Sequence, residues 1–232
     1  MIQIRNQLYQ NIHNLDNRGH IRISATSQWG LRMISDIIPR FKEAFPDVTF
    51  ELSHLDVDIL EKMIDEEKLD FALVSISAKE NLNPTSEILR KEEMLFAVPA
   101  NDPYCKKNPS NEITEEELAH TFYNTNFFLS KKGTANRTLG DQLFSRHNLA
   151  LTSLCEVNGM IMTRDMVAQG IGAAFIPTSC RADEEHVHYY SLSPKLYRYN
   201  ALMHRKNLVL NQPEQLFYSY VMNYFNDDME SI

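Results

Sequence analysis

Three short polar segments carry residue types that could bind a small polar molecule: residues 26–29, 130–134 and 157–159. Each follows an apolar run typical of a strand and precedes a run typical of a helix. In open α/β sheets, ligands bind at the carboxyl ends of strands, where free N–H groups and the helix dipole favour an anion. Hydroxyl and amide side chains there suit a carboxylate or another polar metabolite. The plainer interpretation is that Thr26, Ser27 and similar residues only cap helices.

Motifs for metal binding or catalysis are weaker signals than these three polar segments. His186 and His188 alternate along a predicted strand and could face one zinc ion, but no third ligand has suitable spacing. Asp56 and Asp58 could hold a divalent cation, although an N-cap followed by a first-turn acid explains them better. The sequence contains no GxSxG, HExxH or SxxK motif. We therefore predict neither catalytic residues nor a bound metal.

The three cysteines and the seven glycines also exclude common functions. Cys105, Cys155 and Cys180 are odd in number and widely spaced, which indicates a reducing cytosol rather than a disulfide framework. A redox role for Cys155 or Cys180 stays open. The glycines form neither a GxGxxG fingerprint nor a P-loop, so no nucleotide cofactor is expected.

Composition and charge describe a packed globular protein. The 232 residues are 43% hydrophobic and carry a net charge of −8, which argues against a surface built to bind nucleic acid phosphates. The N-terminal residues lack the apolar core of a signal peptide. No apolar run approaches the roughly 18 residues of a membrane span. A cytoplasmic protein without membrane contact is expected.

The elements that must position these residues alternate between strands and helices. Residues 1–18 carry one narrow apolar stripe, which predicts the end of a helix that packs against another structural element. Two strand–helix runs follow and predict parallel sheets with crossover helices. The predicted strands are 20–25, 48–52, 69–75, 94–98, 126–130, 151–157, 171–176, 187–192 and 196–204. The predicted helices lie at 31–45, 59–64, 160–169 and 216–225, with shorter ones opening at Thr114 and Thr134.

Several segments resemble the effector-binding domain of LysR-type transcriptional regulators. The opening GHIRISATSQWGLRMISDIIPRFKEAFPDVTFEL has the family's strand, polar loop and helix. Later matches are LEKMIDEEKLDFALVS, MLFAVPANDPY, MVAQGIGAAFIP and LMHRKNLVLNQPEQLFYSYV. Each is loose alone, but their order and spacing are specific, and together they cover residues 19 to about 226.

The resemblance implies an α/β fold of the periplasmic-binding-protein-like type 2 class. Two Rossmann-like subdomains would be joined by two crossing strands near residues 94–99 and 198–204. Effector subdomain I would comprise 19–93 and 203–232, and effector subdomain II would comprise 94–202. Residues 1–18 would be the end of the linker helix.

The resemblance also implies that a small-molecule co-inducer binds in the interdomain cleft. A carboxylate or an amino acid fits the polar loops. Trp29 departs from the family's usual polar residue and would stack on a flat ligand or cover the pocket. The positions that match effector-contacting residues are Thr26, Ser27, Gln28, Trp29, Val57, Ser75, Ser130, Lys131 and Asn158.

The implied function is that of a ligand-sensing domain in a bacterial regulator, not an enzyme. DNA would be bound only by a helix-turn-helix that this chain does not contain. A homodimer or tetramer is expected, with helices 31–45 and 160–169 at the interface. Two alternatives stay open: a solute-binding protein of a transporter, which needs a signal peptide, and an enzyme on the same bilobal fold. For an enzyme, the candidate residues are Asp56, Lys131 and Lys132.

Overall fold

The computed structural model describes residues 19–149, 152–205 and 212–229, so the helix predicted at 1–18 lies outside the described residues. The chain forms two compact units. Unit 1 takes the described residues of Met1–Val74, Asn83–Arg90 and Ala201–Ile232. Unit 2 takes those of Ser75–Leu82 and Lys91–Asn200.

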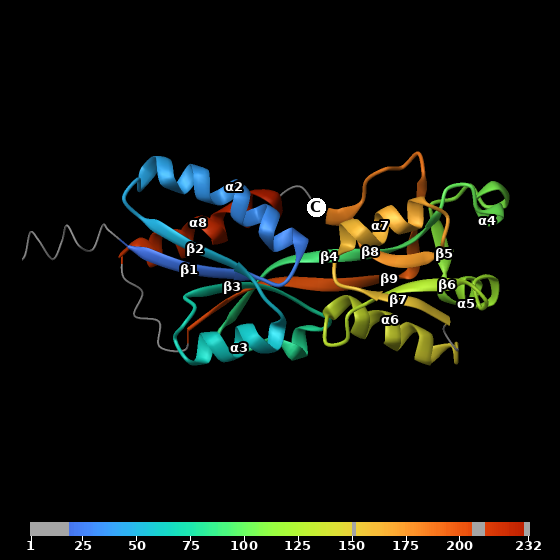
Figure 1. Cartoon of the computed structure of the whole chain (residues 1–232), viewed down its shortest axis with the longest axis horizontal. Coiled ribbons are helices and arrows are strands. Elements are labelled where there is room, and N and C mark those ends of the chain that lie inside the picture. The colour runs from blue at the N-terminus through green and yellow to red at the C-terminus, as the bar shows by residue number, and fades with distance from the viewer. Residues whose placement is uncertain (1–18, 150–151, 206–211, 230–232) are drawn as a thin grey trace, which may run out of the picture. The chain divides into compact units, whose positions relative to one another are not determined.

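Unit 1 is built on a parallel sheet with helices on both faces (Figure 1). β1 lies in the middle and pairs in parallel with β2 and β3. In Figure 1, α2 and α8 lie on one face and α3 on the other. The strands are β1 (His20–Ala25), β2 (Thr49–His54) and β3 (Phe71–Ile76). The helices are α2 (Gln28–Ala44), α3 (Val57–Asp65) and α8 (Gln212–Met229).

Unit 2 also has helices on both faces of its sheet, with strand order β9-β4-β8-β6-β7 and β5 paired to β9. β6 is parallel to β7 and β8, whereas β8 is antiparallel to β4. The strands are β5 (Glu112–Thr114), β6 (Asn126–Ser130), β7 (Thr152–Val157) and β8 (Ala173–Pro177). The helical elements are η1 (Lys79–Asn81), α4 (Pro103–Lys107), α5 (Glu115–Thr121), α6 (Ala135–Arg146), α7 (Met160–Ala168) and η2 (Thr178–Cys180).

Two long strands run through both units. β4 (Ser86–Pro99) passes from unit 1 to unit 2 after Arg90, and β9 (Val187–His204) returns to unit 1 after Asn200. The sequence predicted only 94–98 of β4 and divided β9 into two strands. Both predictions were too short, because the polar and partly exposed residues in these strands interrupt the apolar pattern but not the backbone pairing.

The core of unit 2 follows the two-residue period of β4. Met94 and Phe96 pack with Leu143 of α6, whereas Leu95 and Ala97 belong to the apolar cluster beside α7. Successive side chains of a strand point to opposite faces, so one strand contributes to the core on both sides of the sheet. The predicted fold class, α/β with helices against parallel strands, is confirmed.

Three helix starts follow the predicted capping signals, whereas Asp56 occupies the N-cap position of α3 and its side chain makes no capping hydrogen bond. The side chains of Ser27, Thr114 and Thr134 each accept a hydrogen bond from the backbone N–H three residues later. Gly170 follows the end of α7 with a φ of 78°, the left-handed conformation that favours glycine at this position. These caps fix where the loops after β1 and β6 turn into helices.

Candidate functional site

In unit 1, the predicted site residues follow the carboxyl ends of β1 and β2. The Thr26 amide donates to the Leu73 carbonyl at 3.0 Å, which fixes the loop after β1 against β3. Ser27 caps α2, and Gln28 is the first residue of that helix. Val57 begins α3 and is half-buried. The loop residues therefore present hydroxyl and amide groups beside the first turns of two helices.

Trp29 does not fit the interpretation that its ring stacks on a ligand. Its side chain is 6% exposed and belongs to the apolar cluster of α2, α8 and the sheet. Its ring lies 5.5 Å from the ring of Phe225 on α8, measured between centroids. Because α2 turns this position toward the core, the Trp29 ring packs α2 against α8 and supports the loop after β1 from the core side.

In unit 2, the predicted site residues follow β6 and β7. Ser130 ends β6, and the guanidinium of Arg137 ties its carbonyl (3.2 Å) to the Glu156 carboxylate of β7 (3.0 Å). Lys131 is half-buried, and its carbonyl accepts from the hydroxyl of Thr134 at 2.8 Å. Asn158 is exposed directly after β7. The two loops are therefore held at the same edge of the sheet.

A buried polar network that the sequence analysis did not find lies in the same unit. Its centre is the carboxylate of Glu92 on β4, whose side chain is 0% exposed. Arg198 of β9 donates to Glu92 Oε2 through Nε (2.9 Å) and Nη2 (2.7 Å). Asn200 Nδ2 donates to the same oxygen at 2.8 Å, and the Ser179 amide donates to Oε1 at 2.7 Å. The carboxylate is thus surrounded by donors.

The network ends at two further side chains, Ser75 and Asn136. Ser75 Oγ donates to Asn200 Oδ1 at 2.7 Å, so one predicted site residue belongs to the network. Arg198 Nη1 donates to Asn136 Oδ1 at 3.0 Å, and Asn136 Nδ2 donates to Met160 Sδ at 3.2 Å. Ser75 and Asn136 are each only 8% exposed.

Charge and burial act in opposite directions on Glu92. Burial alone would raise the pKa of this carboxyl, because it disfavours the charged form. The positive charge of Arg198 and the hydrogen bonds from Ser179 and Asn200 outweigh burial and hold the pKa below its ordinary value. Glu92 is therefore a carboxylate at neutral pH, and Arg198 is its counter-ion.

The network lies at the carboxyl edge of the unit 2 sheet. Asn136 is in the first turn of α6, which follows β6, and Met160 is the first residue of α7, which follows β7. Ser179 lies in η2, which follows β8. The elements that follow three strands at one sheet edge thus join one buried network: Asn136 and Ser179 bond the ion pair directly, and Met160 joins through Asn136. This is the edge where α/β proteins bind ligands.

The sequence did contain a signal for this network. Arg198 and Asn200 share the strand phase of Leu192 and Leu202, all of which are buried. A charged residue in the buried phase of a strand requires a buried partner. The partner Glu92 is 106 positions away from Arg198, so residue spacing could not identify it.

The predicted metal and cysteine motifs find no support as sites. The interpretation that His186 and His188 share a strand face is wrong: His186 lies in the turn before β9 and bonds Asp183 at 2.7 Å, whereas the His188 ring contacts Tyr190. Within residues 19–149, 152–205 and 212–229, no three metal-ligating side chains gather. Cys155 is half-buried and Cys180 is buried.

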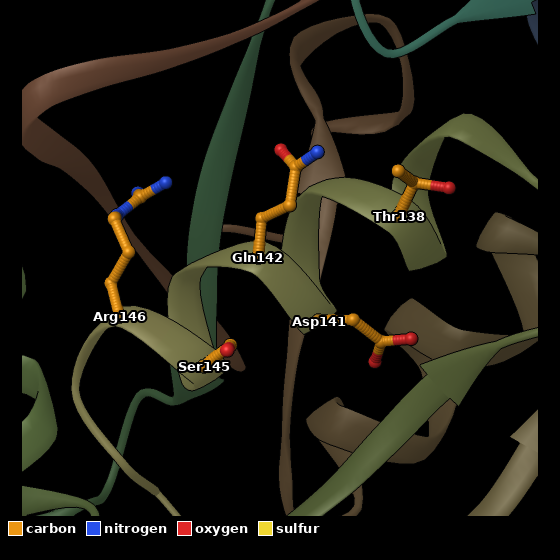
Figure 2. A pocket seen from close by; sticks show the side chains of 5 residues that line it. All are labelled: Thr138, Asp141, Gln142, Ser145 and Arg146. Atoms are coloured by element: carbon orange, nitrogen blue, oxygen red, sulfur yellow. The ribbon is translucent and has the colours of Figure 1, made fainter.

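A surface hollow on unit 2 lies on the outward face of α6 (Figure 2). Every residue that lines it comes from this helix at helical spacing, and no predicted site residue is among them. Asp141 bonds Arg137 at 2.8 Å and Arg146 bonds Glu115 at 2.6 Å, so its charged groups are already paired. It is an exposed helix face rather than a binding site. The lining residues are Thr138, Asp141, Gln142, Ser145 and Arg146.

Comparison with known proteins identifies one family. The model of the LysR substrate binding domain matches residues 15–226. The uncharacterised HTH-type transcriptional regulator YybE of Bacillus subtilis is 25% identical over 213 residues, which cover 91% of this chain and 70% of YybE. The transcriptional dual regulator GltC of the same organism is 22% identical, with 90% and 69% covered. A probable RuBisCO transcriptional regulator of Trichormus variabilis is 23% identical over 180 residues, about half (51%) of its length.

Solved structures share the fold. The regulatory domain of CcmR from Synechocystis PCC6803, in complex with 2-PG, has a TM-score of 0.76 and 14% identity, and the match covers 90% of this chain and 98% of that one. The effector binding domain of QuiR, in complex with shikimate, has a TM-score of 0.70 and 20% identity, with the same coverage. Among the helices of the described residues, none combines the length and apolar character that a membrane span requires.

Proposed function

Because the chain belongs to the LysR substrate binding domain family, we propose that it senses a small-molecule effector for a transcriptional regulator. The observation that carries the proposal is the position of the polar residues. In each unit, taken by itself, hydroxyl and amide groups follow the carboxyl ends of parallel strands. The curated relatives are named as transcriptional regulators, and two similar structures hold shikimate or 2-PG.

We propose effector contacts in each unit, considered separately. A small carboxylate or amino acid suits them, because the N-termini of α2, α3, α6 and α7 favour an anion. Trp29 contributes by supporting its loop, not by contact. The proposed contacts are Thr26, Ser27, Gln28 and Val57 in unit 1, and Ser75, Ser130, Lys131 and Asn158 in unit 2.

Effector binding would act by a shift in population. A ligand favours whichever arrangement of the chain it binds more tightly, and this preference would be passed on through a homodimer or tetramer. The exposed side chains of Ile161 and Met162 support a role for α7 in that assembly. DNA would be bound by another part of the full regulator in the cytoplasm, and this chain would release its ligand chemically unchanged.

A thermal-shift screen of the purified chain against small metabolites tests the proposal. A ligand at a hundred times its dissociation constant adds about 2.7 kcal/mol of stability. Thr26→Ala and Ser130→Ala should each weaken binding of a hit, whereas Ser145→Ala, on the exposed face of α6, should leave it unchanged. The absence of any hit among carboxylates, amino acids and aromatics would contradict the proposal, as would conversion of the bound compound.

A further inference from the structure

The buried network fixes which way the amide of Asn136 points. Arg198 Nη1 donates to Asn136 Oδ1, and a guanidinium has no acceptor with which to bond the amide nitrogen. The oxygen must therefore face Arg198, and the NH₂ group must point away from it. There the NH₂ group donates to the thioether of Met160, which is a weak acceptor. Asn136 thus presents a hydrogen-bond donor that a better acceptor could take over.

The same reasoning fixes the hydroxyl of Ser75. The Glu92 carboxylate only accepts, so Asn200 must turn its NH₂ group toward Glu92 and its oxygen toward Ser75. The Ser75 hydrogen is then used in the bond to Asn200. What Ser75 Oγ offers to anything else is a lone pair, so this end of the network presents an acceptor.

These two ends have opposite polarity and belong to one unit. They are linked through Asn200, Glu92 and Arg198, all at most 2% exposed. If one of the three linking side chains exchanged its donor and acceptor positions, two donors or two acceptors would face each other, which is costly when buried. The polarity of Ser75 and Asn136 is therefore set by side chains of β4 and β9 rather than by the loops.

We propose that the effector carries an anionic acceptor, a carboxylate, for the amide of Asn136, and a hydroxyl or ammonium donor for Ser75. The effector is thus a hydroxy- or amino-carboxylic acid. The carboxylate takes the place of the Met160 thioether, whose flexible side chain moves aside. Lys131 and the first turn of α6 favour the negative charge at this edge. Glu92, Arg198 and Asn200 are positioning residues. This inference rests on the proposed function and names its ligand class.

Matched compounds test the two polar requirements. The panel contains shikimate, lactate and L-serine, together with analogues that lack one group: propionate without the hydroxyl, and methyl lactate and lactamide without the carboxylate. Benzoate, indole and putrescine represent other chemistries. Thermal shift identifies the compounds that bind, and isothermal titration calorimetry measures their affinities.

Asn136→Asp is the decisive variant. An aspartate still accepts from Arg198 but places an oxygen where the NH₂ donor was, so a carboxylate ligand should lose at least about tenfold in affinity. The amide or ester analogue should lose less, which a merely structural defect would not produce. Asn126→Asp makes the same chemical change at an exposed residue that starts β6, and it should bind as the wild type does.

A second variant tests the same inference if Asn136→Asp does not fold. Met160→Leu preserves volume and removes the competing thioether, so the carboxylate should bind more tightly than to the wild type. Any one of three results would overturn this inference but not the proposed function. These results are equal binding to wild type and Asn136→Asp, weaker or unchanged binding to Met160→Leu, and a hit that needs only one of the two polar groups. No hit from the whole panel would overturn the proposed function with it.

Discussion

Replacement of Glu92 by glutamine is expected to lower the free energy of unfolding of unit 2 by about 3–5 kcal/mol. The change is isosteric, so packing is preserved and only charge and hydrogen bonding differ. Arg198, with 3% of its side chain exposed, keeps its positive charge and loses its counter-ion. Removal of one partner of a buried ion pair is costly because the other charge stays desolvated.

The hydrogen bonds of Glu92 explain why an amide cannot substitute. Three N–H groups, two from Arg198 and one from Asn200, point at Oε2, and the Ser179 amide points at Oε1. Glutamine has one oxygen, so in either orientation its NH₂ group faces at least one other donor. The buried donor left without an acceptor costs about 1–3 kcal/mol in desolvation, and this cost is already part of the loss of about 3–5 kcal/mol expected for the variant.

Urea unfolding at pH 7, followed by far-UV circular dichroism, measures this loss. The fluorescence of Trp29, the single tryptophan, reports on unit 1 in the same samples. Glu93→Gln is the matched control. Glu93 pairs with the half-exposed Lys195 and accepts from Ser191 Oγ, a bond that the glutamine oxygen can also accept, so this change should cost no more than about 1 kcal/mol. Equal losses for the two variants would refute the reasoning. The double variant Glu92→Leu/Arg198→Met should be more stable than Glu92→Gln, because no unpaired charge remains.

The pH dependence of the Glu92 effect has a definite sign. The folded-state pKa of Glu92 lies below its ordinary value of 4.5, so folding favours the deprotonated carboxyl. This stabilisation is present in full above the ordinary pKa and is lost as the pH falls through the folded-state value. The difference between wild type and Glu92→Gln should therefore persist at neutral pH and shrink only in that acidic range.

Three further predictions concern packing, assembly and capping. Gly172→Ala should lower the melting temperature, because a Cβ there would lie 2.5 Å from the Asn126 carbonyl oxygen, whereas Gly159→Ala meets nothing within 4 Å and serves as its control. Met162→Lys should shift the chain toward monomer in light scattering if α7 forms an interface, since that side chain is 61% exposed; an unchanged mass would exclude this face. Thr114→Ala should cost about 0.5–2 kcal/mol in urea unfolding by removing the cap of α5.

Local signals predicted most elements because they depend on neighbouring residues. The strand at 20–25 and the caps Ser27, Thr114 and Thr134 were read from alternation and spacing alone, and all are present. The short elements α4 and β5 were missed, since five and three residues are too few to show a period. The predicted strand 187–192 begins where β9 begins, at Val187, so His186 lies just outside it.

The candidate site divides in the same way. Loop residues such as Thr26 and Ser130 could be proposed because they follow predicted strands and match a family pattern. For Trp29 the sequence offered two roles, stacking on a ligand or covering the pocket, and only the packing of α2 on α8 shows that its ring turns inward. The network of Glu92 and Arg198 was missed because strand pairing, not sequence proximity, brings the two residues together.

Loops and strands contribute differently to the candidate site, because their side chains have different hydrogen-bond partners. Thr134 uses its hydroxyl both to accept from the Arg137 amide and to donate to the Lys131 carbonyl, so the cap shapes the loop. Ser75 and Asn136 instead take their polarity from a carboxylate and a guanidinium, groups that can only accept or only donate. A loop residue can change without altering this polarity, whereas a change at Glu92 alters both ends at once. Ligand class in this chain is therefore a property of its sheet, and the loops adjust shape around it.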